Sequence, residues 1–147
     1  MFNKIIIVCT GNICRSPIAE SLFKSALPSK TFQSAGIAVD ESNLTGERAH
    51  PSSIEVATEN GLVIGEHKAQ QLTELMCLEN DLVLVMSHEQ IDEVAQICPL
   101  ARSKTMLIGQ WIGTGEILDP IHLSRESFEI VYDILERAVA SWTTKIH

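Results

Sequence analysis

The sequence has few basic residues, no long apolar run and no recognisable export signal. Eleven Lys and Arg against 19 Asp and Glu give a formal net charge of −8. This balance argues against a nucleic acid or an anionic membrane surface as the partner. The N-terminal MFNKIIIVC lacks the apolar length and the small-residue cleavage site of a signal peptide, and no stretch approaches a membrane span. We therefore expect a cytoplasmic protein without membrane insertion.

Paired cysteines, repeats and linkers are also missing. The four cysteines contain no CxxC pair, which argues against a structural zinc site and fits a reducing compartment. For Cys77 and Cys98 we expect plain burial. No repeat, low-complexity tract or composition break interrupts the chain. With 147 residues and 45% hydrophobic content, the sequence predicts one domain, residues 1–147.

What the sequence does contain is the stretch IIIVCTGNICRSP, which begins at Ile5. Its first four residues are apolar and β-branched without alternation, which is typical of a strand buried on both faces of a parallel sheet. The pattern then changes to Cys9, five residues and Arg15. Ser16 is a plausible helix N-cap, and Pro17 suits the first helical position. The stretch predicts a strand, a tight loop and a helix start.

The chemistry of this loop follows from its expected geometry. A loop that closes onto a helix N-terminus directs backbone N–H groups and the positive dipole end into one small cup, which binds an oxyanion. Cys9 in that cup is expected to be a thiolate nucleophile, and Arg15 to grip two phosphate oxygens. Gly11 lets the backbone approach closely, and Asn12 tolerates a left-handed conformation. The alternative, Cys9 as a buried core cysteine, does not explain why these features occur together.

Cys14 lies in the same expected loop and has two open interpretations. Its thiol is placed to trap an oxidised Cys9 as a disulfide before irreversible oxidation. It is equally suited to fill space as a small apolar side chain. The sequence does not choose between the two.

The rest of the chain alternates strand-like and helix-like segments. Strands are predicted at 31–35, 82–86 and 105–108, and helices at 17–26, 51–60, 70–77, from a capping box of Ser87 and Gln90, and at 124–144. Residues 39–50 and 109–123 read as long loops. The alternation predicts a single doubly wound α/β domain, with a parallel sheet and helices on both faces. Ligands bind beyond the carboxyl ends of such strands, where Cys9 lies.

Asp119 is the candidate general acid. Cleavage of a phosphate ester needs a proton for the leaving oxygen, and a carboxylic acid on a rim loop is a usual source. Asp119 lies in the late connection after a strand, and Pro120 biases it toward an extended conformation. The alternative is that this Asp-Pro pair only begins a turn.

The segment CTGNICRSP resembles the signature of the low-molecular-weight protein tyrosine phosphatases. The SAG at 34–36, the GEHKA at 65–69 and the run ICPLARSKTMLIGQW resemble the bacterial exopolysaccharide-associated branch, and the similarity covers essentially the whole chain. The resemblance implies a four-stranded parallel sheet in the order 2-1-3-4. It also implies a phosphotyrosine protein as substrate, expected to be the tyrosine-rich tail of a membrane-associated tyrosine autokinase that controls exopolysaccharide export.

The resemblance also implies roles for individual residues. Cys9 would attack phosphorus, Asp119 would protonate the tyrosyl oxygen, and the Ser16 hydroxyl would stabilise the departing thiolate. Ser34 and His67 would support the loop around Asn12; without the resemblance, both would be read as structural. No cofactor and no metal are expected. The phosphate would be held by Arg15 and by the backbone of the loop residues Thr10, Gly11, Asn12, Ile13 and Cys14.

The sequence departs from the family pattern around the expected cleft. The family has a Tyr directly after the Asp-Pro pair, whereas this chain has Ile121 followed by His122. No aromatic residue lies between positions 32 and 111, so the wall from the first loop would be aliphatic, with Leu44 as the candidate. The loop 37–50 also looks longer than in relatives, and His50 stands where an Asp is usual. We expect apolar contact with the substrate ring without aromatic stacking.

Two other functions remain open. An arsenate reductase uses a similar fold and Cys-to-Arg loop but needs two further thiols in a mobile, closely spaced pair. Cys77 and Cys98 are the only candidates and lie 21 positions apart. A phosphotyrosine-binding module without turnover is the second alternative. Binding alone needs neither a nucleophile nor an acid, so the presence of both Cys9 and Asp119 argues against it.

Overall fold

The computed structural model describes residues 2–146, which form four strands and five α-helices. The strands are β1 (Lys4–Cys9), β2 (Thr31–Gly36), β3 (Leu82–Val85) and β4 (Thr105–Leu107). The α-helices are α1 (Ser16–Ala26), α2 (Pro51–Glu59), α3 (Glu74–Glu79), α4 (His88–Ile97) and α5 (Arg125–Thr143), with short 3₁₀ helices η1 (Pro99–Lys104) and η2 (Gln110–Ile112). All strand pairs are parallel, in the order β2-β1-β3-β4. The sheet order implied by the resemblance is therefore confirmed.

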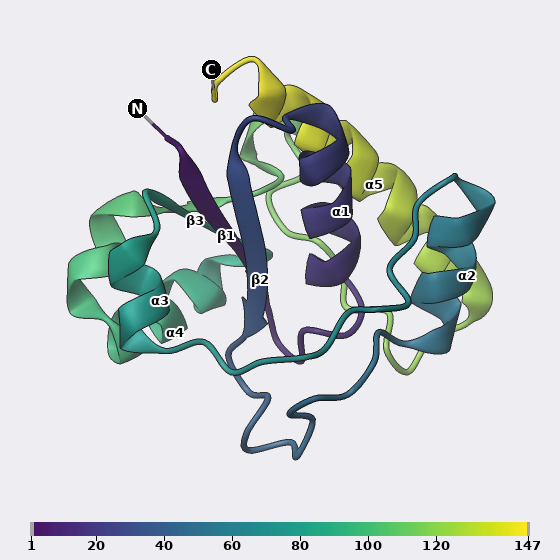
Figure 1. Ribbon diagram of the computed structural model, residues 1–147, viewed down its shortest axis with the longest axis horizontal. Helices are drawn as coiled ribbons and strands as arrows, with labels where there is room; N and C mark the ends of the chain where they lie inside the picture. The colour runs from purple at the N-terminus through teal and green to yellow at the C-terminus, as the bar shows by residue number, and fades with distance from the viewer. Residues whose placement is uncertain (1, 147) are drawn as a thin grey trace.

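Helices cover both faces of the sheet, as predicted (Figure 1). Successive side chains of a strand point to opposite faces, so β1 contributes to two cores. Ile5 and Ile7 pack into the larger core with α1, α2 and α5, whereas Ile6 and Val8 pack into a smaller one with α3, α4 and η1. This two-sided burial explains why the β1 sequence is apolar without alternation.

Helix α5 closes the larger core with one apolar face. Its buried residues recur at helical spacing, and Trp142 also donates an indole hydrogen bond to the Ile108 carbonyl oxygen at 2.8 Å. The face contains the predicted residues Phe128, Val131, Leu135, Val139 and Trp142, together with Tyr132 and Ala138. No helix among residues 2–146 combines the length and hydropathy needed to cross a bilayer.

Two local predictions were wrong in detail. The helix expected at 70–77 begins only at Glu74, because Gln71 pairs with Gly36 in an isolated parallel bridge and the Thr73 side chain caps the helix. Ser16 is not the N-cap of α1 but its first residue, and Arg15 occupies the cap position. A contact with β2 therefore delays the start of α3, whereas the Ser16 hydroxyl is engaged by the side chains of Cys9 and Asn12 in the same loop.

The capping box predicted at the start of α4 is only half formed. The Ser87 hydroxyl accepts from the backbone N–H of Gln90, as expected. The Gln90 side chain does not return to Ser87, because its Oε1 accepts from the backbone N–H of Met86 at 2.8 Å. Its amide nitrogen is thereby left free for a contact in the site.

Strand β2 brings its end directly against the loop that follows β1. A Cβ atom at Gly36 would lie 2.7 Å from the Thr10 carbonyl oxygen and 3.0 Å from the Asn12 nitrogen. Only glycine permits this approach. Beyond Gly36, the N–H groups of Ile37 and Ala38 donate to the carbonyl oxygens of Cys9 and Thr10 at 3.0 and 2.9 Å. The sheet therefore fixes the start of the loop at its carboxyl edge.

Candidate active site

The loop between β1 and α1 turns its carbonyl oxygens outward. Nearly all of them accept a hydrogen bond from a residue outside the loop, as expected because a buried carbonyl oxygen without a partner is costly. Within the described chain, by contrast, none of the N–H groups of residues 11–15 donates to another residue. The carbonyl partners are Ile37 for Cys9, Ala38 for Thr10, His67 for Asn12, His50 for Ile13, Ser53 for Cys14 and Ala19 for Arg15. Donors that face inward at a helix N-terminus form an anion-binding cup.

Asn12 is the centre of the hydrogen bonds that hold this loop. It is fully buried and has φ +57°, the left-handed conformation expected for it. Its Oδ1 accepts from the Gln70 backbone N–H at 3.0 Å. Its Nδ2 donates to the hydroxyls of Ser16 and Ser34, at 2.7 and 3.0 Å. The imidazole Nε2 of His67 lies 2.6 Å from its carbonyl oxygen.

Cys9 lies at the end of β1 with its side chain against Ser16. The Cys9 Sγ and the Ser16 Oγ are 3.0 Å apart, and both residues are almost fully buried. A hydroxyl at this distance is able to donate to a thiolate and so favour the charged sulfur. The first turn of α1 also contributes its positive dipole end.

Arg15 is buried, with its guanidinium held by three groups. Its Nη1 donates to the Ile117 carbonyl oxygen at 2.8 Å, and its Nη2 lies 3.3 Å from the Thr10 hydroxyl and 3.4 Å from the Asp119 carboxylate. Its Nε is buried and has no hydrogen-bond partner within residues 2–146. A buried N–H donor on a cationic group, with no protein partner, is suited to bind an anionic ligand.

Asp119 both begins a turn and reaches the pocket. Its Oδ1 accepts from the backbone N–H of Ile121 at 3.2 Å, and its Oδ2 faces Arg15. Its side chain is 38% exposed, so the carboxylate is open to solvent on one side. The two interpretations of the Asp-Pro pair are therefore compatible, because one oxygen serves the turn while the other faces Arg15 in the pocket.

These side chains line one small pocket. Ile121 borders it, whereas Leu44 lies over the loop, 3.0 Å from where a Cβ of Gly11 would be, and lines a neighbouring groove with Ile13. His122 is exposed and does not line the pocket. The pocket residues are Cys9, Gly11, Ile13, Cys14, Arg15, Asp119 and Ile121.

Cys14 differs electrostatically from a reactive thiol. Burial raises its pKa to about 12, and the nearby Cys9 and Asp119 act in the same direction. Cys14 is therefore a neutral thiol at neutral pH. Oxidants that react with thiolates should therefore react slowly with Cys14.

His67 holds the loop as a neutral imidazole. Burial lowers its pKa below the ordinary value, and this outweighs the opposing hydrogen bond to the Asn12 carbonyl oxygen. A neutral imidazole that contacts a carbonyl oxygen through Nε2 carries its proton on that nitrogen. His50 also has a lowered pKa, because of burial and the nearby His122.

Sequence reasoning missed several residues that contact the loop or Ser34, which supports it. Gln90 donates from Nε2 to the Thr10 hydroxyl at 3.2 Å, and Gln70 donates from Nε2 to the Ser34 carbonyl oxygen at 2.9 Å. Glu20 accepts from the Ser34 hydroxyl. In the sequence, Gln90 is notable only for its position three residues after Ser87. That spacing predicts a capping box and does not indicate a contact with Thr10.

The other cysteines lie in a different part of the molecule. Cys77 and Cys98 are buried in the smaller core, on the opposite face of the sheet from α1. Burial and the neighbouring Cys98 raise the pKa of Cys77 to about 11. Their expected burial is confirmed. Within residues 2–146, no cluster of three or more His, Cys, Asp or Glu side chains could hold a metal ion.

A parallel α/β sheet with a Cys-x5-Arg anion cup between β1 and α1 is the arrangement expected of a cysteine-dependent phosphate-ester hydrolase. Within that class, the profile of the family described as low molecular weight phosphotyrosine protein phosphatase matches residues 4–147. The chain belongs to this family, and the resemblance found in the sequence is confirmed.

The similarity extends over entire relatives. The probable low molecular weight protein-tyrosine-phosphatase AmsI of Erwinia amylovora is 46% identical over 146 residues, which cover 99% of both chains. The structure of Vibrio vulnificus Wzb in complex with benzylphosphonate superposes with a TM-score of 0.96 at 47% identity, covering 99% of both chains. The tyrosine phosphatase Wzb from Escherichia coli K30, in complex with sulphate, gives 0.95 at 42% identity, with both chains fully covered.

Proposed function

We propose that this chain hydrolyses phosphotyrosine in proteins through a cysteinyl-phosphate intermediate. One observation carries the proposal: Asp119, more than 100 positions further along the chain, lines the same small pocket as Cys9 and Arg15. The chemistry needs a nucleophile, an anion clamp and a proton donor. Membership of the phosphotyrosine phosphatase family supports phosphotyrosine as the substrate class.

In the first step, the Cys9 thiolate attacks phosphorus in line with the tyrosyl oxygen. The inward N–H groups of the loop and the Arg15 guanidinium hold the equatorial phosphate oxygens. Asp119 gives its proton to the leaving tyrosyl oxygen, which departs as a neutral phenol. The phosphoryl charge is met by Arg15 and backbone dipoles, so the proposal includes neither a metal nor another cofactor.

In the second step, the ionised Asp119 takes a proton from a water molecule, and this water attacks the cysteinyl phosphate. Inorganic phosphate forms, and the sulfur leaves as a thiolate. The Ser16 hydroxyl, 3.0 Å from the Cys9 Sγ, stabilises that thiolate by a hydrogen bond. The same contact would favour the thiolate before the first step.

We further propose that the substrate is the tyrosine-rich tail of a membrane-associated tyrosine autokinase that controls exopolysaccharide synthesis and export. The support is the resemblance to the exopolysaccharide-associated branch, together with the relatives named AmsI and Wzb. An enzyme acting on such a tail would work in the cytoplasm. The net charge of −8 would repel a phosphorylated tail at long range, so its capture would depend on local donors.

Hydrolysis of an aryl phosphate in the presence of EDTA tests the proposed activity. We expect full turnover with EDTA and none by Cys9→Ser, although this variant should still bind a phosphotyrosine peptide through the loop N–H groups and Arg15. A chain that binds the peptide without turnover would be a binding module. Thiol-dependent reduction of arsenate without phosphatase activity would indicate the reductase, a function disfavoured by the burial of Cys77 and Cys98.

A further inference from the structure

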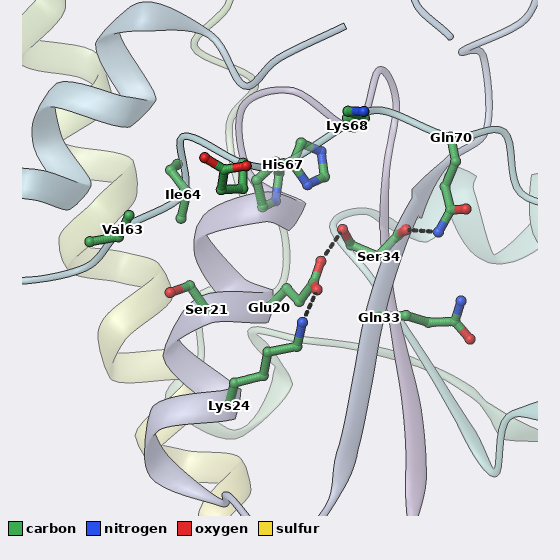
Figure 2. A pocket seen from close by; sticks show the side chains of 12 residues that line it. Glu20, Ser21, Lys24, Gln33, Ser34, Val63, Ile64, His67, Lys68 and Gln70 are labelled. Carbon is green, nitrogen blue, oxygen red and sulfur yellow. Dashed lines mark hydrogen bonds and ion pairs between the residues drawn. The ribbon is translucent and has the colours of Figure 1, made fainter. Parts of the chain in front are cut away.

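Glu20 lies on α1, outside the pocket that contains Cys9. It lines a polar pocket of about 350 Å³ between α1, the end of β2 and the segment 63–70 (Figure 2). One carboxylate oxygen accepts a hydrogen bond from the Ser34 hydroxyl at 2.5 Å, and the other pairs with Lys24 (Figure 2). Its side chain is 18% exposed, which is low for a carboxylate whose only task is a surface ion pair.

We propose that Glu20 is a positioning residue that acts through Ser34 and Asn12 to make Ser16 the donor in its hydrogen bond to Cys9. The proposal rests on the proposed function, because it concerns the residue assigned there as nucleophile. It adds a residue that touches neither the phosphate nor the reacting sulfur.

The first step concerns the proton of Ser34. A carboxylate can only accept, so the contact with Glu20 takes the single hydroxyl proton of Ser34. Ser34 is 2% exposed, so solvent does not compete for this proton. The Ser34 oxygen is then left as an acceptor, and the side-chain amide of Asn12, 3.0 Å away, must be the donor.

The second step concerns the orientation of the Asn12 amide. The Gln70 backbone N–H can only donate, so the Asn12 atom that it contacts at 3.0 Å must be the oxygen. The NH₂ group therefore faces the two serines. One of its protons goes to Ser34, and the other goes to the Ser16 hydroxyl oxygen at 2.7 Å.

The third step leaves the Ser16 proton for the sulfur. Ser16 accepts from Asn12, and the only acceptor for its own proton among residues 2–146 is the Cys9 Sγ at 3.0 Å. The bonds from Glu20 through Ser34, together with the Gln70 N–H that orients Asn12, thus hold Ser16 in the orientation that stabilises a thiolate. Without Glu20, the Ser34 hydroxyl is free to rotate, and the Asn12 amide loses one of its fixed partners.

The charge of Glu20 and its hydrogen bond act on Cys9 in opposite directions. Removing a negative charge favours a thiolate, which lowers the pH at which Cys9 ionises. Losing the ordered chain disfavours the thiolate and raises that pH. The other charged and titratable groups that face these two residues are Cys14, Arg15 and Asp119 near Cys9, and Lys24, Glu66, His67 and Lys68 near Glu20.

The test is the pH dependence of Cys9 alkylation by iodoacetamide, read by mass spectrometry of the peptide that contains Cys9. We expect Glu20→Ala to raise the midpoint by about 0.5–1 pH unit, the range of one lost hydrogen bond. Glu20→Gln keeps an acceptor for Ser34 and should stay near wild type. Lys24→Ala removes the ion pair but not the chain, and serves as the matched control.

A double mutant tests whether Glu20 acts through Ser34. Ser34→Ala should produce a similar rise by itself, and adding Glu20→Ala to it should produce no further rise. An unchanged or lowered midpoint in Glu20→Ala would overturn the proposal, as would an equal further rise in the Ser34→Ala background. Alkylation does not require turnover, so failure of the proposed phosphatase activity would appear separately, as absent aryl phosphate hydrolysis by the wild-type chain.

Discussion

The Asp119 carboxylate lies 3.4 Å from the Arg15 guanidinium, at the edge of a pocket that Cys9 also lines. The Asp119 side chain is 38% exposed, so the pair contributes little to stability. This pair has a functional consequence, because the proposed acid contacts the group proposed to bind phosphate. A bound phosphate would compete for Arg15 and leave Asp119 free to face the leaving oxygen.

Asp119→Ala should slow hydrolysis according to the leaving group. With phosphotyrosine, a poor leaving group, we expect kcat to fall by about two to four orders of magnitude, the range for a positioned acid. With p-nitrophenyl phosphate, the loss should be much smaller. Asp92→Ala is a suitable control, because Asp92 is 67% exposed and pairs with Arg102 far from the pocket. Equal losses with both substrates would mean that Asp119 is not the acid.

Protonation of His67 should lower the free energy of unfolding at mildly acidic pH. Its pKa in the folded chain is lowered from 6.5, so the unfolded chain binds a proton more readily. The free energy of unfolding is therefore highest above about pH 6.5 and falls as the pH drops toward the lowered value. His67→Gln should weaken this dependence, because an amide keeps the N–H donor without titrating.

Thermal unfolding between pH 5 and 7.5 measures this effect. Some dependence should remain in His67→Gln, because the pKa of His50 is also lowered. A pH dependence identical to that of the wild type would mean that His67 does not stay neutral in the folded chain.

Peroxide should inactivate the wild type reversibly. Cys9 is oxidised first to a sulfenic acid, and Cys14, which lines the same pocket, then displaces water to form a disulfide that added thiol reduces. Cys14→Ser lacks the second thiol, so its inactivation should become irreversible. Recovery of activity after thiol treatment is the measurement. Oxidised wild type without a Cys9–Cys14 disulfide in its mass spectrum would end this hypothesis.

Ile121→Tyr should improve binding of phosphotyrosine peptides without faster chemistry. Ile121 borders the pocket, and ring stacking is worth roughly 0.5–1.5 kcal/mol beyond area burial. We therefore expect KM to fall by up to about tenfold at constant kcat. Leu123→Tyr places the same ring at an exposed position of the loop that does not line the pocket, and it should change neither constant. An unchanged KM in Ile121→Tyr would place the cleft wall elsewhere.

The sequence predicted what depends on local patterns. The apolar run before Cys9 and the five-residue spacing to Arg15 specify a strand, a loop and a helix start within one short stretch. Asparagine tolerates the left-handed backbone conformation, which predicts that conformation for Asn12, and its φ of +57° agrees. Alternation of strands and helices predicted the doubly wound sheet, whereas the strand order needed the family resemblance.

Contacts between distant residues could not be predicted in the same way. Arg15 donates to a carbonyl oxygen 102 positions later, and Gln90 reaches Thr10 across 80 positions. Both depend on how strands are ordered, which no local pattern encodes. Ser16 was mistaken for a cap because serine often satisfies a helix start, but its hydroxyl here serves Cys9 and Asn12.

The most direct test of the proposed mechanism is to trap phosphate on Cys9. Asp119→Ala should accept phosphate from p-nitrophenyl phosphate and then hydrolyse the intermediate slowly, because it lacks the group that activates water. Acid quench during turnover, followed by peptide mass spectrometry, should show a phosphoryl group on Cys9 and none in a variant that also carries Cys9→Ser. Hydrolysis by Cys9→Ser near the wild-type rate, or turnover with no phosphate on Cys9, would contradict the mechanism.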